Sequence, residues 1–330
     1  MMDWTDRHCR YFLRGFSPSV LLYTEMITTA AILRGDQQRL LAFDFAEQPV
    51  ALQLGGSEPA KLADAAVAGE AAGYCEINLN CGCPSERVVS GAFGACLMRE
   101  PELVAECVAA MCARVSVPVT VKMRIGVVER KERKSLGPIV DFNEDEFEAL
   151  RDFVAAIAAA GCARAIVHAR KAVLGGLSPK ENRAIPPLRY DVVRQLKGEF
   201  PALPIVVNGG FQDTAAILDA LNWSDGVMLG REAYHHPLVL AKLHLALHSE
   251  DARPSIERGA ILERMASYAE REMARGVRLS SITRHMLGLY AGEPGAREFR
   301  RLLSEAARAP GANAQLLRDA GRAFLGAPAS

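Results

Sequence analysis

The sequence lacks several features that would place it in other classes of protein. Lys and Arg together equal Asp and Glu in number, so the chain as a whole has no basic character that would attract nucleic acid. The first ten residues carry charge from Asp3 onward and hold no apolar segment typical of a signal peptide. No uncharged run reaches the ~18 residues that span a bilayer. We therefore expect a protein of the cytoplasm that does not enter a membrane.

Cysteines are present, but not at the spacing of a structural metal site. Cys81 and Cys83 stand in a C-x-C pattern, whereas structural zinc sites commonly use C-x2-C pairs or a mixture of Cys and His. The eight cysteines are expected to be reduced in the cytoplasm. We expect no metal and no disulfide, and Cys75 is expected to be a small core residue. On chemistry alone, Cys83 is a nucleophile, an acid or a packing residue.

Positive charge is nevertheless concentrated towards the C-terminus. From Arg253 onward the chain contains thirteen arginines, eight acidic residues and no lysine. Arginine is the residue best suited to bidentate contact with phosphate. A solvated helical surface explains the same composition equally well.

Short β-branched segments alternate with longer helical patterns along most of the chain. We predict strands at 21–27, 49–55, 74–80, 118–125, 163–170, 204–210 and 226–232. We predict helices at 58–72, 101–115, 144–160, 187–199 and 212–222. Asn143 and Glu146 form a capping box at the start of one of these helices. Apolar strands separated by amphipathic helices indicate a parallel sheet.

Polar residues and glycines recur at the carboxyl ends of these strands, as in a (β/α)8 TIM barrel, whose active site is assembled from those ends. We predict an α/β fold with such a barrel in residues 1–245 and a small all-α helical domain in residues 246–330. Only seven strands are visible, so the first barrel strand is expected to be truncated, with "MMDWTD" in the loop that follows it.

The side chains at these strand ends indicate a ligand. Lys122 interrupts an apolar strand and needs a charged or electron-rich partner, because desolvating a lysine alone is costly. His168 ends another apolar strand, a place where a histidine is more often a core residue. Gly-rich turns close the last two strands, where barrels typically bind phosphate. With Gln53, these groups outline a site for a phosphorylated, redox-capable ring.

Longer motifs give the chain a resemblance to a known family. The segments "LLYTEMITT", "EINLN-GCPS-RV", "VPVTVKMRIG", "SPKENR", "DGVM-GREAY" and "ITRHMLGL" occur in the order found in tRNA-dihydrouridine synthases. "SPKENR" and "ITRHMLGL" resemble the A type of the bacterial group. The resemblance extends over almost the whole chain.

The resemblance implies an FMN-binding barrel followed by a helical tRNA-binding domain, in a monomer. It implies reduction of the C5–C6 double bond of uridine in the tRNA D-loop, at positions 20 and 20a. Hydride passes from NADPH or NADH through FMN to C6, and an acid on the opposite face protonates C5.

The residues that match the family's motifs are expected to take the family's roles. Cys83, in "GCP", is the expected proton donor, because a thiol keeps its proton at neutral pH; Cys81 is expected to be a bystander. The resemblance assigns cofactor binding to Met1, Met2, Gln53, Lys122, His168, Asn208, Gly209, Gly210, Gly230 and Arg231. It assigns tRNA binding to Asn80, Lys180, Arg183, Arg297 and Arg300. Met1 and Met2 are included among the cofactor-binding residues because the family's first strand ends in Ala-Pro-Met, of which only Met1 remains here.

Three other functions each account for only part of these features. A flavin barrel acting on a free pyrimidine, as in dihydroorotate dehydrogenases, leaves the Arg-rich C-terminal part without a role. A non-catalytic RNA-binding module leaves Cys83, Lys122 and His168 unexplained. A Schiff-base aldolase built on Lys122 explains neither the "GCP" motif nor the arginines.

Residues 127–142 look longer than the corresponding loop of the family. Arg130, Lys131, Arg133 and Lys134 concentrate positive charge in this segment. A solvated loop explains the charges, and an added contact to the tRNA backbone is the alternative hypothesis.

Overall fold

The computed structural model describes residues 1–85, 88, 91–129, 139, 141–248 and 257–324. The chain divides into two compact units. The sheet unit comprises Tyr23–Ala42 and Val50–Leu229, and the helical unit comprises Met1–Leu22, Phe43–Pro49 and Gly230–Ser330. The helical unit therefore begins before the expected boundary at residue 246 and includes N-terminal residues as well. A division of function at that boundary stays a prediction.

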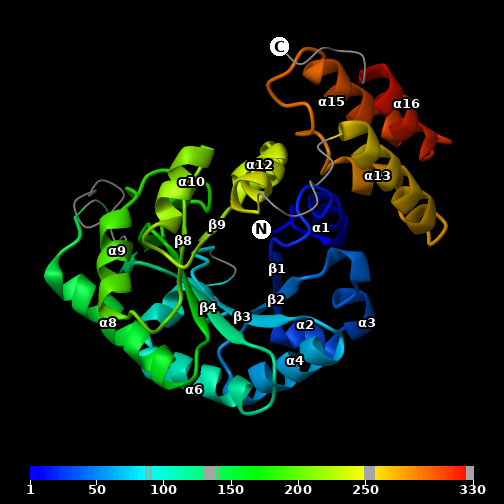
Figure 1. Ribbon diagram of the computed structural model, residues 1–330. Coiled ribbons are helices and arrows are strands. Elements are labelled where there is room, and N and C mark those ends of the chain that lie inside the picture. The colour runs from blue at the N-terminus through cyan, green and yellow to red at the C-terminus, as the bar shows by residue number, and fades with distance from the viewer. Residues whose placement is uncertain (86–87, 89–90, 130–138, 140, 249–256, 325–330) are drawn as a thin grey trace. The chain divides into compact units, whose positions relative to one another are not determined.

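The sheet unit is built on a curled parallel sheet of seven strands (Figure 1), which confirms the predicted α/β fold. The order across the sheet is β1-β2-β3-β4-β6-β8-β9, with β1 and β9 at its edges. The strands are β1 (Leu22–Thr28), β2 (Val50–Gly55), β3 (Glu76–Cys81), β4 (Val119–Arg124), β6 (Arg164–His168), β8 (Ile205–Asn208) and β9 (Gly226–Met228). Each corresponds to one of the seven predicted segments, although β9 ends four residues earlier than expected.

Helices follow the strands and cover the outer face of the sheet (Figure 1). They are α2 (Thr29–Arg34), α3 (Gln37–Leu40), α4 (Pro59–Ala71), α6 (Pro101–Cys112), α8 (Glu144–Ala159), α9 (Tyr190–Glu199) and α10 (Thr214–Leu221). All five predicted helices are present. The predicted capping box starts α8, where Asn143 Oδ1 accepts the N–H of Glu146 at 2.9 Å and Glu146 Oε2 accepts the N–H of Asn143 at 3.1 Å.

The pleat of the strands separates apolar from polar side chains. A Cβ on Gly69 of α4 would lie 2.5 Å from Leu52 and 2.8 Å from Ile77, so these apolar side chains face the helices. Successive side chains of a strand point to opposite faces. Gln53 and Asn78, one position further along, therefore face the inside of the curl. The inner face of this sheet is the polar one.

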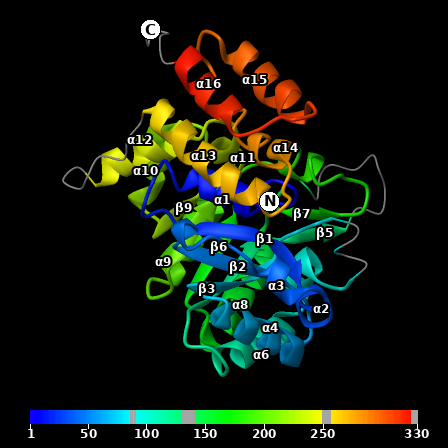
Figure 2. The same cartoon turned by 90° about the vertical axis from the view of Figure 1, so that its right-hand side faces the viewer.

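A second, two-stranded parallel sheet joins β5 (Val127–Glu129) and β7 (Ala172–Leu174), which lie side by side in Figure 2. Two 3-10 helices, η2 (Gly94–Arg99) and η3 (Glu181–Arg183), lie in the loops of the same unit. The start of the predicted basic loop therefore forms β5. Its four basic residues, Arg130, Lys131, Arg133 and Lys134, lie outside the described residues.

The helical unit is all-α in its described part. It contains α1 (Arg7–Leu13), η1 (Phe45–Glu47), α11 (Arg231–His235), α12 (Leu238–Leu247), α13 (Arg258–Met273), α14 (Leu279–Thr283), α15 (Ala296–Glu305), η4 (Ala306–Arg308) and α16 (Gln315–Phe324). Helices α13 and α16 pack against each other through buried residues such as Leu262 and Leu317. Across both units, no helix in the described ranges is long and apolar enough to cross a membrane.

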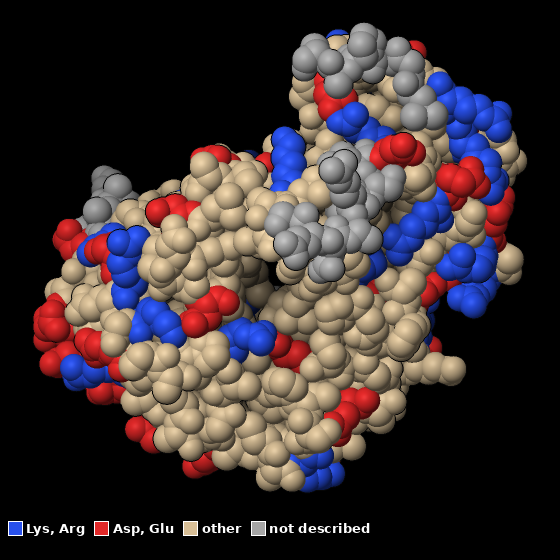
Figure 3. Space-filling model, in the orientation of Figure 1, with Lys and Arg blue, Asp and Glu red and all other residues tan. Residues whose placement is uncertain are grey.

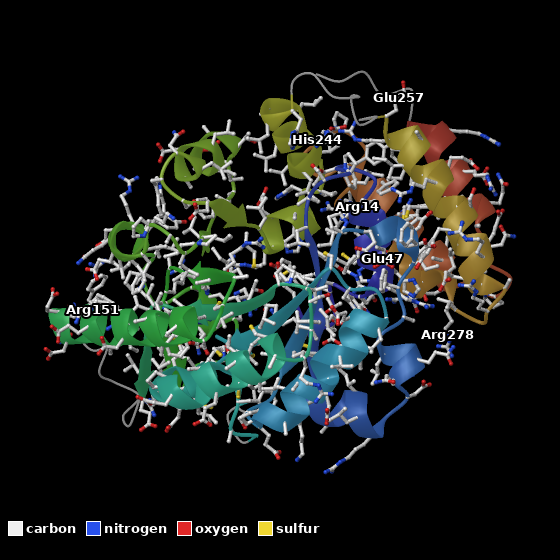
Figure 4. All side chains as sticks on the ribbon, turned by 60° about the horizontal axis from the view of Figure 1, so that its bottom comes forward. Arg14, Glu47, Arg151, His244, Glu257 and Arg278 are labelled. Atoms are coloured by element: carbon white, nitrogen blue, oxygen red, sulfur yellow. The ribbon has the colours of Figure 1, made fainter. Side chains whose placement is uncertain are left out.

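Arg14 ties the N-terminal segment of the helical unit together. Its guanidinium donates hydrogen bonds to the backbone carbonyls of Ser17, Val20, Glu47 and Pro49 at 2.7 to 3.1 Å. Figure 4 shows Arg14 and Glu47 close together. Because a buried arginine must satisfy its donors, these four carbonyls hold residues 43–49 against the start of the chain.

Candidate functional site

Polar side chains from neighbouring strands meet at the carboxyl ends of the sheet. The strand register pairs Gln53 with Asn78, Asn80 with Lys122, Arg124 with His168, and His168 with Asn208. The carboxyl ends of parallel strands share one edge of a sheet, and active sites of barrel enzymes are assembled there. The structure thus brings together the predicted site residues of the sheet unit that lie on β2, β3, β4, β6 and β8.

Cys83 follows β3 in a turn whose backbone is held from both sides. Asn80 Oδ1 accepts the N–H groups of Gly82 and Cys83 at 3.0 and 2.9 Å. Arg124 Nε donates to the carbonyl of Gly82 at 3.0 Å, and the N–H of Ala95 donates to the carbonyl of Cys83 at 2.9 Å. The turn is therefore fixed by side chains that themselves sit on β3 and β4.

Gly94 lets the chain pass close to this turn. Its φ is +75°, and a Cβ there would lie 2.7 Å from the carbonyl oxygen of Cys83. A side chain at this position would therefore displace the turn. The Cys83 side chain is only partly buried, and its Sγ donates to Ser85 Oγ at 3.5 Å.

Cys81 lies in a different environment from Cys83. It ends β3, is fully buried, and has a thiol whose pKa is raised by burial and by the neighbouring thiol of Cys107. A thiol without access to solvent cannot reach a substrate, which supports the expected role of bystander. Cys75 precedes β3 and is only partly buried, so it is not the core residue that was expected. Within the described ranges, no three His, Cys, Asp or Glu side chains are arranged to hold a metal ion.

Lys122 projects from β4 towards the end of β8. Its Nζ donates to Asn208 Oδ1 at 3.2 Å, and Asn208 Nδ2 donates to the carbonyl of Met228 at 2.8 Å. Burial, with a smaller contribution from the charge of Arg124, lowers the pKa of Lys122 to about 8. Because burial penalises the ammonium, its place favours a negatively charged or electron-rich partner.

The turn after β8 has a backbone that only glycine adopts easily. Gly209 has φ +123°, and a Cβ there would lie 2.6 Å from the ring of His168. Gly210 has φ +72°, and it lines a groove of about 460 Å³ together with Leu188 and Tyr190. The ring of His168 and the side chain of Leu188 therefore lie so close to this backbone that a side chain at either position would displace them.

The other predicted cofactor residues belong to the helical unit. Met1 lies beside Gly230, where a Cβ would be 3.3 Å from Met1 Sδ. Met2 is 56% exposed, and Arg231 is exposed at the start of α11. The structure brings Met1 and Gly230 together within that unit. A cofactor-binding role for these four residues stays a prediction.

Lys180 directly precedes η3 and Arg183 is its last residue, and both are exposed. Between them, the fully buried Asn182 exchanges hydrogen bonds with the backbone of Val173 at 2.7 and 2.9 Å. Arg124 Nη1 donates to the carbonyl of Asn182 at 3.0 Å. The segment that carries the two basic residues is therefore tied to the same arginine that holds the Cys83 turn.

The predicted site omitted four inner-face residues: Glu76, Asn78, Thr120 and Arg124. All four are buried, and all four take part in hydrogen bonds that lead to the Cys83 turn. A signal for them was present in the sequence. Polar residues stand at every second position of "EINLN" and of "TVKMR", which is the period of one face of a strand.

In the helical unit, α15 presents basic residues to solvent. Arg297, Arg300 and Arg301 are exposed, whereas Phe299 and Leu303 on the other side of the helix are buried. No ion pair of these three arginines occurs among the described residues. Figure 3 shows Lys and Arg gathered over the region of α13, α15 and α16, with Asp and Glu between them.

These features define a class of protein. A parallel sheet that curls on itself, with helices outside and convergent polar side chains at the carboxyl ends of its strands, is the architecture of the barrel enzymes. Comparison with known families is more specific. The chain belongs to the dihydrouridine synthase family, whose model, "Dihydrouridine synthase (Dus)", matches residues 1–325. It is therefore an oxidoreductase of a flavin-dependent family.

Curated relatives agree with this assignment over most of their length. A protein of Xanthomonas campestris pv. campestris is 52% identical over 320 residues, which cover 97% of this chain and 90% of that protein. A protein of Pseudomonas aeruginosa is 53% identical over 304 residues, covering 92% and 87%. One of Salmonella typhi is 51% identical over 321 residues, covering 97% and 92%. Each of the three is named tRNA-dihydrouridine(20/20a) synthase.

Proposed function

We propose that this protein reduces the C5–C6 double bond of uridine in the D-loop of tRNA, at positions 20 and 20a, with FMN as its flavin and NADPH as its reductant. The observation that carries the proposal is the placement of Cys83 in a fixed turn after β3, at the carboxyl end of the sheet where the neighbouring strand β4 carries Lys122. A proton donor and a cation at the same strand ends suit the reduction of a ring. The names of the relatives agree with this substrate.

The residues at the strand ends fit FMN. Lys122 supplies a cation for negative charge on the ring system, and Gln53 Nε2 has a second N–H besides the one it gives to Asn78. The turn of Gly209 and Gly210 follows β8 next to His168, at the place where barrels typically bind phosphate. When bound, FMN supplies the hydride for C6 of uracil.

Cys83 supplies the proton in this proposal. Hydride addition at C6 builds negative charge towards C5, and the Cys83 thiol gives its proton to C5 from the opposite face. The thiolate that remains takes a proton from solvent before the next turnover. Asn80 and Arg124 hold the turn, so the thiol is in position before the substrate arrives.

Binding of tRNA is assigned to charged groups on both units. Arg297 and Arg300 lie three residues apart on α15 and share its exposed face. Lys180 and Arg183 supply exposed positive charge near η3. Asn80 is proposed to contact the substrate nucleotide through the N–H of Nδ2 that it does not give to Gln53.

We also propose that the protein acts as a monomer in the cytoplasm. One chain contains every residue that the mechanism uses. The relatives, which are named for a modification of tRNA, agree with this compartment.

Two matched variants test the role of Cys83. In Cys83→Ala, dihydrouridine formation in D-loop tRNA should fall by about 10²- to 10⁴-fold, the usual contribution of a positioned acid. Flavin content and the rate of flavin reduction by NADPH should stay at parental values. The control is Cys81→Ala, which removes the buried thiol and should leave turnover near that of the parent.

Retention of activity in Cys83→Ala would assign the proton to another group. The same assay, run with orotate and free uridine in place of tRNA, addresses the substrate. Turnover of a free pyrimidine without turnover of tRNA would replace the proposed function by that of a pyrimidine dehydrogenase.

A further inference from the structure

A chain of hydrogen bonds runs along the inner face of the sheet from Glu76 to the backbone of Cys83. In order, Thr120 Oγ1 donates to Glu76 Oε1 (2.6 Å), Asn78 Nδ2 to Thr120 Oγ1 (2.9 Å), Gln53 Nε2 to Asn78 Oδ1 (2.9 Å), Asn80 Nδ2 to Gln53 Oε1 (2.8 Å), and Cys83 N to Asn80 Oδ1 (2.9 Å). The five side chains are between 0 and 8% exposed. Every step therefore lies in protected surroundings, where an unmade hydrogen bond is costly.

The direction of this chain is determined at both of its ends. An ionised carboxylate only accepts, so Thr120 must donate to Glu76 and accept from the amide nitrogen of Asn78. A backbone N–H only donates, so Asn80 must turn its oxygen to Cys83 and its nitrogen to Gln53. Reversal of any one amide would place nitrogen against nitrogen or oxygen against oxygen. Both ends require the same orientation of Asn78, Gln53 and Asn80.

Glu76, the first member of this chain of hydrogen bonds, is itself held by two further side chains. It is 3% exposed, and Arg164 Nη1 donates to its Oε2 at 2.8 Å. Tyr23 donates its hydroxyl to Oε1 at 2.7 Å. Burial, together with the neighbouring charge of Glu76, raises the pKa of Tyr23, so this hydroxyl stays a donor. Glu76 thus accepts from an arginine and from two hydroxyl groups, which are the partners that a buried carboxylate requires.

We propose that Glu76 is a positioning residue for the reaction, which orients the amides of Gln53 and Asn80 through Thr120 and Asn78 and thereby places Cys83. The proposal rests on the proposed role of Cys83 as proton donor. Glu76, at the start of β3, would thus determine the geometry of the turn that follows the end of the same strand. Gln53 is left with an N–H, and not an oxygen, as the group still to be used by a ligand.

The substitution that interrupts the chain of hydrogen bonds is Thr120→Val, which keeps the branched shape of the side chain and removes its hydroxyl. Thr120→Ser keeps the hydroxyl and is the rescue variant. Thr283→Val is the matched control. Thr283 is also buried, and its hydroxyl donates to the backbone carbonyl of Leu303, which takes no part in the hydrogen bonds between Glu76 and Cys83. Thermal unfolding of all three variants, by circular dichroism, shows how far each loses stability.

Two readouts separate positioning from a general loss of stability. In Thr120→Val holoenzyme, kcat for tRNA should fall by about 10- to 100-fold at little changed KM, as expected when a reacting group is misplaced by about 1 Å. Alkylation of Cys83 by iodoacetamide, located by mass spectrometry on full-length protein, should become at least about threefold faster, because the turn has lost an anchor. Thr120→Ser should restore both values, and Thr283→Val should change neither.

Parental kcat and a parental alkylation rate in Thr120→Val would overturn the proposal. So would a loss in Thr120→Val that Thr120→Ser does not restore, or an equal loss in Thr283→Val. The alkylation rate reports the turn whether or not Cys83 is the acid. If Cys83→Ala is active while Thr120→Val still changes the alkylation rate, the proposed acid fails and the positioning of the turn stands.

Discussion

Two places in the molecule, the inner face of the sheet and helix α15, use charge in opposite ways. In the sheet unit, the charges of Glu76 and Arg164 lie on the inner face and are paired with each other at 2.8 Å. In the helical unit, Arg297 and Arg300 stand exposed on α15, and no ion pair of theirs occurs among the described residues. The first arrangement holds side chains in one geometry, and the second leaves side chains available.

This difference has a physical basis. A charge taken out of water must recover its lost hydration from partners at fixed positions, so a buried pair makes its surroundings rigid. An exposed arginine keeps its hydration and its freedom, and it gains most when it meets a phosphate and releases counterions. The inner face of the sheet is thus suited to chemistry, and α15 is suited to binding a polyanion.

The helical unit contains its own contrast. On α16, Arg318 donates to Glu263 and Glu270 of α13, at 2.9 Å in the first case. Arg322 lies 3.7 Å from Asp319. These two arginines have acidic partners within the protein, whereas no ion pair of the α15 arginines occurs in the part of the chain that the structure describes. Arginine content alone therefore does not locate a binding face.

Removal of the cation from the strand ends should have the largest effect. In Lys122→Met, flavin content should fall and tRNA turnover should drop by about 100-fold. An effect of this size is expected when an enzyme loses one group that stabilises the negative charge formed in the transition state. Lys122→Arg, which keeps the charge, should lose less. Flavin absorbance per mole of protein and single-turnover reduction by NADPH measure the two effects. Full flavin content and normal reduction in Lys122→Met would separate Lys122 from the cofactor.

Removal of the exposed charges on α15 should change binding and leave the chemistry alone. For Arg297→Ala/Arg300→Ala, KM for tRNA should rise by about tenfold at low salt, with kcat and flavin content unchanged. The salt slope of binding should fall by about one unit for each lost contact. Arg318→Ala/Arg322→Ala is the matched control with paired arginines. If the control changes the slope as much as the α15 variant, the contrast between the two helices has no functional meaning.

The basic residues at 130–134 should have a smaller effect of the same kind. Changing Arg130, Lys131, Arg133 and Lys134 to Ser should raise KM for tRNA by about threefold near 50 mM salt, where charge contacts are least screened. Equal KM values for variant and parent would leave these residues as a solvated segment.

The last expected effect is a pH dependence of stability, which concerns the fold and not the activity. Lys122 has a pKa of about 8 in the folded protein and near its usual 10.5 when unfolded. Between these values the unfolded chain binds more protons, so the contribution of Lys122 to the stability of flavin-free protein should rise as pH increases from about 8 to 10.5. The difference between parent and Lys122→Met, in urea unfolding at each pH, isolates this contribution. A flat difference would show that the ammonium is not penalised in the fold.

Particular residues show how far the sequence allowed prediction. The period-two and helical patterns predicted the seven strands of the large sheet and five of its helices, because side-chain burial imposes those periods locally, but they missed β5 and β7. The predicted strand 74–80 placed both Cys81 and Cys83 after its end, which was wrong for Cys81, because this residue ends β3 and is buried. Glu76 and Thr120 were missed, since each is an ordinary strand residue until its partner on the neighbouring strand is known. Their alternation with apolar residues was the one local signal.

By itself, the sequence determined the α/β order of the elements, the family and the candidate proton donor, all of which depend on local pattern or on motif. The tertiary structure alone decided that Cys81 is buried while Cys83 is held in a partly accessible turn. It further decided that Arg318 pairs with Glu263, while no ion pair of the α15 arginines occurs among the described residues. It also decided the hydrogen-bond chain from Glu76. These properties depend on which strands and helices become neighbours, because desolvation and hydrogen bonding are set by the atoms that surround a group and not by its position in the chain.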